Sequence, residues 1–113
     1  MGKEEMKQYA VNISMHAERD ISGALDYIEF TIKNPTAGDE LFYAVKEAIG
    51  SLECNPKRFP IVDEEILAAL GIRVLCVKNY LAFYIVNDEK ESITVVRFCH
   101  HRSNWKNILK VEI

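Results

Sequence analysis

Two consecutive helical patterns, separated only by an Asn-Pro pair, constrain this chain more than any other feature of its sequence. Apolar residues recur every three to four positions over residues 17–32, and the same period resumes over residues 37–52. Asn34 and Pro35 interrupt the pattern, because proline disfavours helical backbone in the residue before it and suits the first turn of a new helix. Helices joined by so short a link fold back on each other, so the sequence predicts an antiparallel helical hairpin.

Polar residues at the ends of the two patterns are typical helix caps. Ser14 or His16 begins the first helix, which ends at the Asn-Pro pair. The second helix has two candidate caps: Asn34, followed directly by proline, or Thr36, with Asp39 three residues further on. Both alternatives start the second helix immediately after the first.

Four extended segments flank the helical pattern. They are predicted at residues 9–15, 72–77, 80–86 and 92–99. The first alternates apolar and polar residues, whereas residues 80–86 are apolar on both faces and are predicted to be a central strand. Lys78 and Asn79 join the second and third strands, and asparagine tolerates the positive φ of a tight hairpin.

The element order predicts the fold class. A long connector covers residues 54–71, with one short helical turn at 64–70, and a last helix covers 104–109. Strand, helix, helix, three-strand meander and short helix together predict an α+β two-layer fold, in which the helical hairpin packs on one face of a mainly antiparallel four-stranded sheet. We expect one domain at residues 9–113 after a flexible tail at 1–8.

The core and the open face follow from this arrangement. The second helical stripe and the central strand should supply the buried residues: Val45, Leu52, Phe83, and either Ile85 or its neighbours Tyr84 and Val86. A sheet covered by helices on one face leaves apolar surface on the other. We expect a partner segment to lie over that face and in the groove between sheet and helices, and the isolated chain to dimerise through it.

Composition excludes several classes of protein. The chain has 113 residues, of which 49% are hydrophobic and 27% charged, as expected for a globular domain and not for a disordered one. The longest apolar run has seven residues, too few to cross a bilayer, and the N-terminus has no apolar signal segment. The sequence therefore predicts a cytoplasmic protein.

Cysteine usage points to neither a disulfide framework nor a metal site. Cys54, Cys76 and Cys99 are odd in number and far apart in sequence, so we expect three reduced thiols. Zinc binding by Cys99 with His100 and His101 is disfavoured, because adjacent strand residues diverge. No metal and no cofactor is expected.

Charge is distributed unevenly along the chain. The formal net charge is −3, but residues 16–71 hold five basic and eleven acidic residues, whereas 72–113 hold seven basic and four acidic ones. The longest acid-free basic stretch contains His100, His101 and four cationic residues: Arg97, Arg102, Lys106 and Lys110. Such a stretch is either a solvated face or a local phosphate site on an acidic protein.

Several residues stand in these elements in a recognisable order. They are Ala17, Asp20 and Ile21; Asp26, Tyr27 and Ile28; Asn34, Pro35 and Ala37; Leu52, Asn55 and Pro56; Arg73, Asn79, Tyr80 and Tyr84; and Arg97, His100, Arg102 and Trp105. Over about residues 9–109 this set resembles the RelE/ParE superfamily of bacterial toxins. The long helix pair with its Asn-Pro turn is more similar to the ParE side.

The resemblance implies a toxin of a type II toxin–antitoxin module, as found in plasmid stabilisation systems. Such a toxin arrests growth, is neutralised by a cognate antitoxin, and forms a homodimer or a toxin–antitoxin hetero-oligomer. RelE-like members are metal-free mRNA interferases that act on the ribosome, whereas ParE-like members inhibit DNA gyrase and are not nucleases. A non-toxic orphan interaction domain is the third alternative.

Metal-free RNA cleavage requires a base, an acid and a cation near the scissile phosphate. The catalytic candidates are His100, Arg102 and Arg97. His100 is favoured over His101 because successive strand residues point to opposite faces and His100 shares the face of Phe98. The candidates for phosphate or target binding are Arg73, His101, Trp105 and Lys106.

Three features depart from the nuclease members of the superfamily. Those members resemble one another in an arginine directly after the hairpin tyrosine, and here Leu81 follows Tyr80. Their central strands are rich in lysine and arginine, and their overall charge is strongly basic. Here the strands are apolar and the net charge is −3. These departures favour gyrase inhibition over RNA cleavage.

Overall fold

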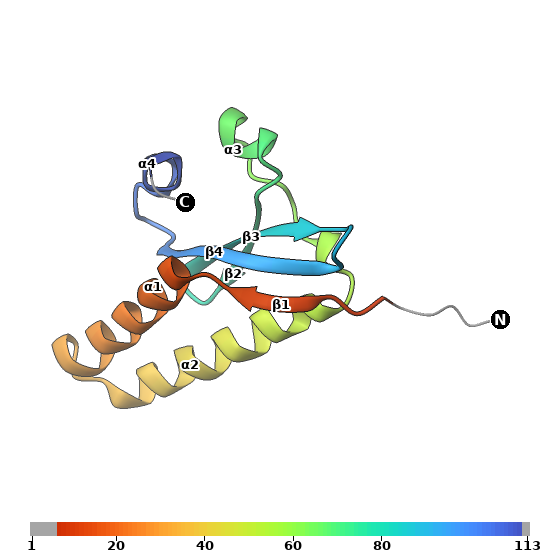
Figure 1. The fold of residues 1–113 in the computed structure, drawn as a ribbon. Helices are drawn as coiled ribbons and strands as arrows, with labels where there is room; N and C mark the ends of the chain where they lie inside the picture. The colour runs from red at the N-terminus through yellow and green to blue at the C-terminus, as the bar shows by residue number, and fades with distance from the viewer. Residues whose placement is uncertain (1–6, 112–113) are drawn as a thin grey trace.

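The computed structural model describes residues 7–111 (Figure 1). Most of the predicted tail at 1–8 lies outside the described residues. In chain order the elements are β1 (Ala10–Ile13), α1 (Met15–Asp26), a π-helical segment (Tyr27–Thr31), α2 (Pro35–Gly50), 3-10 turns (Ser51–Glu53 and Pro56–Arg58), α3 (Glu65–Ala69), β2 (Arg73–Val77), β3 (Tyr80–Asn87), β4 (Ser92–His100) and α4 (Trp105–Val111). The predicted α+β class is confirmed.

The four strands form one sheet in the order β1-β4-β3-β2. β2, β3 and β4 are an antiparallel meander, and β1 pairs parallel to β4 with Val11 opposite Ile93. The α1–α2 hairpin lies along one face of this sheet (Figure 1). The predicted apolar strand, β3, is therefore internal, between β2 and β4.

Caps define both helices of the hairpin. The Ser14 hydroxyl accepts a hydrogen bond from the Ala17 N–H at 3.1 Å, and the Asn34 side chain accepts one from the Ala37 N–H at 3.1 Å. The N-cap of α1 is therefore Ser14 and not His16, and the N-cap of α2 is Asn34 and not Thr36. The predicted first helix is two pieces, because the α-helix changes to π-helical hydrogen bonding after Asp26.

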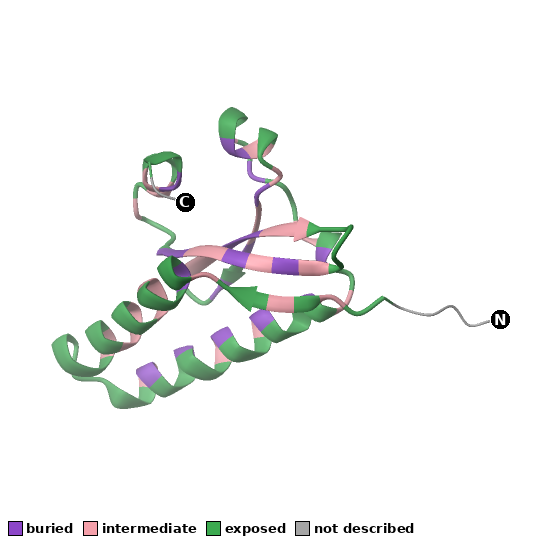
Figure 2. Ribbon diagram, in the orientation of Figure 1, coloured by how far each residue is buried: buried purple, intermediate pink, exposed green. Residues whose placement is uncertain are grey.

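Two apolar clusters hold the layers together. The first lies between the hairpin and the sheet and contains the predicted Val45, Leu52 and Tyr84. The second lies on the opposite face and contains the predicted Phe83. Four of the predicted core residues are buried, whereas Ile85 and Val86 are half-buried (Figure 2).

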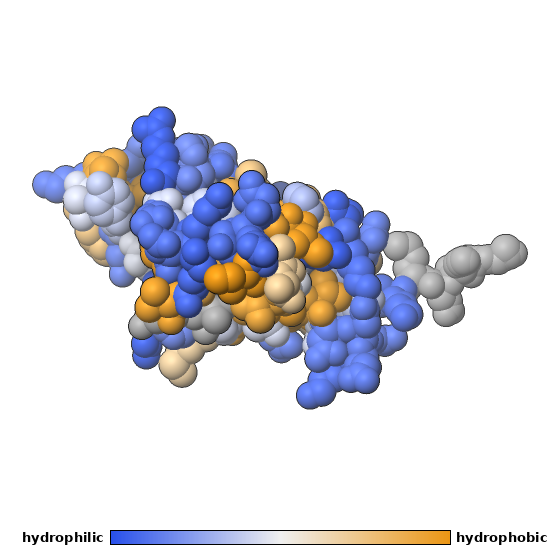
Figure 3. Space-filling model, turned by 90° about the horizontal axis from the view of Figure 1, so that it is seen from above, coloured by the Kyte–Doolittle hydropathy of each residue, from blue (hydrophilic) through white to orange (hydrophobic). Residues whose placement is uncertain are grey.

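The second face of the sheet is partly covered, which corrects the expectation of an open face. α3 and α4 both stand on that side, where Trp105 of α4 packs on Phe83 with ring centroids 4.9 Å apart (Figure 1). Apolar surface remains in the middle of the molecule when it is viewed from this side (Figure 3). α4 presents an apolar face of Trp105, Ile108 and Leu109, but periodicity along a short helix does not report which face of the sheet the helix covers.

The connector between α2 and β2 is tied to the edge of the sheet. The Val62 N–H donates to the Ile72 carbonyl at 3.0 Å, and Ile61 forms a bridge with Arg73. The hydroxyl of buried Tyr84 donates to the Pro56 carbonyl, and burial raises the pKa of that hydroxyl. Within residues 7–111, no helix combines the length and apolar character needed to span a membrane.

Candidate functional site

The end of β4 carries the predicted histidine and arginine. His100 is the last residue of the strand, and its Nδ1 accepts a hydrogen bond from the Arg102 N–H at 3.1 Å. The hydroxyl of Ser103 donates to the His100 carbonyl at 2.7 Å. These bonds form a tight turn that holds Arg102 directly beside His100.

Aromatic rings are stacked beneath this turn. The Tyr80 ring lies parallel to the Phe98 ring with centroids 4.9 Å apart, and the His100 ring meets Tyr80 edge-on at 5.2 Å. Phe98 and His100 thus share one face, as predicted. Burial, and to a smaller extent the nearby Tyr27, raises the pKa of the Tyr80 hydroxyl.

The expected divergence of the two histidines is wrong. The His100 and His101 rings lie side by side with centroids 4.8 Å apart and an interplanar angle of 28°. The alternation of strand residues does not reach His101, because the chain turns there and the His101 N–H donates to the Asn79 carbonyl at 2.9 Å. Both histidines are exposed and available to one ligand.

Arg102 and Lys106 lie on the surface near the histidines in sequence but differ in their contacts. Among the described residues, no side chain binds the exposed Arg102 guanidinium. Lys106 lies 3.6 Å from an Asp63 carboxylate oxygen and 5.6 Å from the centroid of the Trp105 ring. Of these two cations, Arg102 is therefore the one without a competing acid.

Arg97 is engaged by an aspartate of α1. Its Nε and Nη2 donate to the two carboxylate oxygens of Asp20 at 2.7 and 3.1 Å, and the side chains are only 12% and 18% exposed. Asp20 also accepts a hydrogen bond from the Phe98 N–H at 3.0 Å. β1 ends at Ile13, so Asp20 takes the place of a strand partner along the last part of β4.

Arg73 is held by the fold apart from the histidines, and Trp105 packs on Phe83 in the second core cluster. Arg73 donates to the carbonyls of Lys57 and Phe59 at 3.1 and 2.7 Å. It pairs with Tyr84, four residues along β3 from the partner of His100, and β3 separates its strand from β4. The structure does not bring Arg73 to the histidine site, because the hairpin register places it at the far end of β2, opposite the middle of β3.

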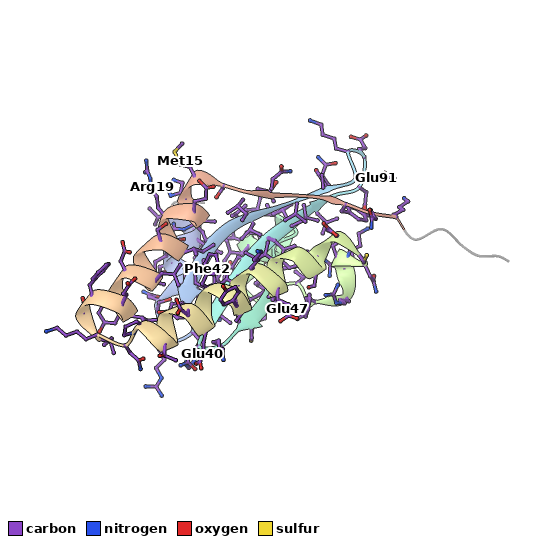
Figure 4. All side chains as sticks on the ribbon, turned by 90° about the horizontal axis from the view of Figure 1, so that it is seen from below. Met15, Arg19, Glu40, Phe42, Glu47 and Glu91 are labelled. Carbon is purple, nitrogen blue, oxygen red and sulfur yellow. The ribbon has the colours of Figure 1, made fainter. Side chains whose placement is uncertain are left out.

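A groove that the sequence analysis did not predict runs between the two long helices. It has a volume of about 540 Å³ next to the end of β1 and continues as a smaller hollow of about 190 Å³ toward the hairpin tip. Phe42 lines both parts and is 47% exposed (Figure 4). The apolar floor consists of Ile13, Ile21, Leu25, Phe42, Val45 and Ile49.

A sequence signal for this groove did exist. Phe42 follows Leu41, a residue of the buried stripe, and so widens the apolar face of α2 beyond the contact with the sheet. Val45 lies on the groove side of the same stripe. An apolar helix face that is wider than its contact with the sheet indicates that a second element or a partner packs on the rest of that face.

Comparison with known proteins shows which family the chain belongs to. The family model described as "ParE toxin of type II toxin-antitoxin system, parDE" matches residues 11–105. The chain belongs to this family. It is therefore a toxin of the type II toxin–antitoxin systems with the ParE/RelE fold. No curated protein matches the sequence significantly.

Two solved structures illustrate the fold of this ParE-family toxin. One is the chromosomal ParDE system from P. aeruginosa, with a TM-score of 0.66, 15% identity, and coverage of 82% of this chain and 96% of that chain. The other is the toxin–antitoxin complex RelBE2 from Mycobacterium tuberculosis, with a TM-score of 0.61, 23% identity, and coverage of 87% and 97%. Both are toxin–antitoxin systems, as the sequence predicted for this chain.

The chemistry open to the β4 end of this ParE-family toxin is limited. His100 and His101 supply two exposed imidazoles that can act as acid or base, and Arg102 supplies one cation able to bind a phosphate bidentately. Within residues 7–111, no group of three potential ligands is placed to hold a metal ion. The site offers a cationic, aromatic surface with one arginine.

Proposed function

We propose that this ParE-family toxin arrests growth by binding DNA gyrase and does not cleave mRNA. The observation that carries this proposal is the pairing of Arg97 with Asp20. It removes one of the three catalytic candidates from contact with a phosphate. Leu81 follows Tyr80 where nuclease members of the superfamily carry arginine, which removes a second cation from the same end of the sheet.

The energetic argument concerns the charge of the transition state. Loss of a single donor that stabilises a developing oxyanion slows a reaction by about 10²–10³-fold. With Arg97 paired to Asp20, only Arg102 remains to oppose the phosphorane charge beside His100 and His101. Inhibition by binding requires no base and no acid, only a surface complementary to the target.

Expression of the toxin without antitoxin tests the target. We expect growth arrest with induction of the DNA-damage response and intact mRNA on translating ribosomes. A purified gyrase supercoiling assay should show inhibition by the wild-type protein. Rapid codon-phased mRNA cleavage, abolished by His100→Ala or Arg102→Ala, would make the protein an mRNA interferase and overturn the proposal.

We further propose that the antitoxin docks in the groove between α1 and α2. This groove is apolar and open, whereas the space between sheet and hairpin, which the sequence suggested as the docking site, is filled by the first core cluster. β1 borders it as an edge strand, and the parallel ladder with β4 turns the N–H groups of Val11 and Ile13 outward. An extended antitoxin segment has a free strand edge there.

A matched pair of aromatic substitutions tests the groove. Phe42→Asp places a charge in the groove and should abolish co-purification with the product of the neighbouring reading frame and rescue from growth arrest. Tyr43→Asp is the control, because Tyr43 is 64% exposed on the adjacent surface and does not line the groove. Equal antitoxin binding by the two variants would place the antitoxin elsewhere.

A further inference from the structure

The turn after β4 and the turn between β2 and β3 meet at one end of the sheet. The His101 N–H donates to the Asn79 carbonyl at 2.9 Å and so fastens the two turns to each other. Lys78 and Arg102, one in each turn, are exposed, and within residues 7–111 neither side chain has a hydrogen-bond or ion-pair partner. These two cations, with His100 and His101 between them in the chain or in space, form a cationic corner that is open to an anion.

Arg102 is the stronger anion ligand of the two cations. Lys78 lines a hollow of about 210 Å³ together with Glu40, whose carboxylate repels a second anion there. The guanidinium of Arg102 can instead form two parallel N–H bonds to one anion. Arg97, a third cation of this end of β4, is paired with Asp20. Arg102 therefore decides where an anion binds in the cationic corner.

Hydrogen bonding determines which atom His100 offers to that anion. Its Nδ1 accepts a hydrogen bond from the Arg102 N–H at 3.1 Å. A neutral imidazole that accepts at Nδ1 carries its proton on Nε2, so the exposed ring presents an N–H donor. While that bond holds, His100 acts as a donor beside the Arg102 guanidinium. Both groups thus suit a negatively charged oxygen.

One arginine with an imidazole donor beside it matches a backbone phosphate of a nucleic acid. Each such phosphate carries a single negative charge, and a guanidinium binds it bidentately. A cleavage reaction adds negative charge in its transition state and needs further donors at the same place. With Arg97 paired to Asp20, the cationic corner has enough positive charge for the bound phosphate and too little for that transition state.

The rest of the molecule opposes binding of a nucleic acid by this corner alone. The net charge is −3, and residues 16–71 hold five basic and eleven acidic residues. Affinity for a nucleic acid backbone grows with the number of phosphates that a protein neutralises, so one or two contacts supply little. The phosphate must therefore be brought to Arg102 by a larger partner that binds both the toxin and the nucleic acid.

We propose that the cationic corner binds a backbone phosphate of the DNA duplex held by gyrase, through Arg102 and His100. This inference rests on the proposed gyrase target. Gyrase acts on duplex DNA, so a toxin bound beside the duplex meets its phosphates. Contacts with the gyrase protein supply most of the affinity, and the phosphate contact makes the toxin prefer the gyrase–DNA complex to free gyrase.

Fluorescence anisotropy of labelled toxin tests this preference. The toxin is titrated with gyrase, with gyrase saturated by a DNA duplex, and with the duplex alone. We expect about fivefold tighter binding to the gyrase–DNA complex than to free gyrase, since that is the upper contribution of one exposed ion pair. The duplex alone should not bind over the same concentration range. Equal affinity for gyrase with and without DNA, or binding of the duplex alone as tight as that of the complex, would overturn the inference.

Two substitutions that remove the same charge locate the contact. Arg102→Gln should lower the affinity for the gyrase–DNA complex by about fivefold and reduce the slope of log K against log salt by about 0.9, the value for one phosphate. Lys90→Gln is the matched control, because Lys90 is exposed in the β3–β4 turn at the other end of β4. Equal weakening by the two variants, or equal weakening by Arg102→Gln with and without DNA, would exclude the phosphate contact. A thermal melt of each variant confirms that the fold is retained.

A supercoiling assay and a ribosome titration separate this inference from the proposed gyrase target. If the toxin inhibits supercoiling but binds gyrase equally with and without DNA, the target is right and only the phosphate contact is wrong. If the toxin binds gyrase in neither state and instead binds ribosomes that carry mRNA, through Arg102, the phosphate belongs to RNA and both proposals fail.

Discussion

Removal of the Asp20 carboxylate is the sharpest test of how β4 is held. Asp20→Ala leaves the Arg97 guanidinium without its acid and the Phe98 N–H without its acceptor. Loss of one partner from a buried ion pair costs about 3–5 kcal/mol, and we take about 2 because 12% and 18% of the two side chains remain exposed. The orphaned N–H adds about 1 kcal/mol.

The expected loss is therefore about 3 kcal/mol of unfolding free energy. For a domain of this size 1 kcal/mol changes the melting temperature by about 4 °C, so Asp20→Ala should melt about 12 °C lower. Asp20→Asn should lose about half as much, since its amide oxygen still accepts from the Phe98 N–H. Differential scanning calorimetry measures both.

A double variant shows whether the unpaired charge causes the loss. Asp20→Ala with Arg97→Met removes acid and base together, and should be more stable than Asp20→Ala alone because no buried cation is left. Arg102→Ala is the control and should melt within about 1 °C of the parent, as expected for an exposed side chain that has no side-chain partner within residues 7–111. An Asp20→Ala melting temperature within about 2 °C of the parent, or strictly additive effects of the two substitutions, would refute the structural role of the pair.

Three further predictions concern stability. Val45→Asp buries a charge in the first core cluster and should cost about 3 kcal/mol or more, and a variant that melts like the parent would contradict the packing of α2 on the sheet. Tyr84→Phe removes the hydrogen bond to the Pro56 carbonyl and should lower unfolding free energy by about 1–2 kcal/mol, measured as a lower urea midpoint with unchanged slope; an unchanged midpoint would show that the bond contributes nothing. The Leu67 N–H donates to the Glu64 carboxylate and lowers the pKa of that carboxyl from its ordinary 4.5, so the stabilisation is present above pH 4.5 and is lost as the pH falls through the folded-state pKa. Glu64→Gln should therefore reduce the fall in melting temperature on acidification. If the melting temperatures of the variant and the parent fell in parallel with pH, the effect would be excluded.

Local signals in the sequence predicted the helical hairpin and narrowed each N-cap to two candidates, of which the structure selected Ser14 and Asn34. A helix cap interacts only with the first turn of its own helix, so it can be predicted without knowledge of the rest of the chain. This holds for Ser14, and for Asn34 with Pro35. The apolar run of β3 likewise predicted an internal strand, because a strand covered on both faces carries apolar residues on both.

The candidate site was predicted less well because its geometry depends on contacts distant in sequence. Arg97 was a reasonable phosphate ligand until the fold placed Asp20, 77 residues earlier, against it. Arg73 seemed near the histidines in the predicted meander, but the pairing register placed it opposite Tyr84, four residues along β3 from the partner of His100. Periodicity reports which face a side chain occupies and does not report which side chain from another element meets it.

By itself the sequence determined the class of fold, the helical hairpin, the internal strand and the identity of the toxin superfamily, since each depends on local periodicity or on residue order. Only the tertiary structure decided that α3 and α4 cover part of the second face, that His100 and His101 lie side by side, and that an apolar groove with acidic rims opens between α1 and α2. These features arise where elements distant in the chain meet. The hydrophobic periodicity of a single element does not report which other element it contacts or how favourable that contact is.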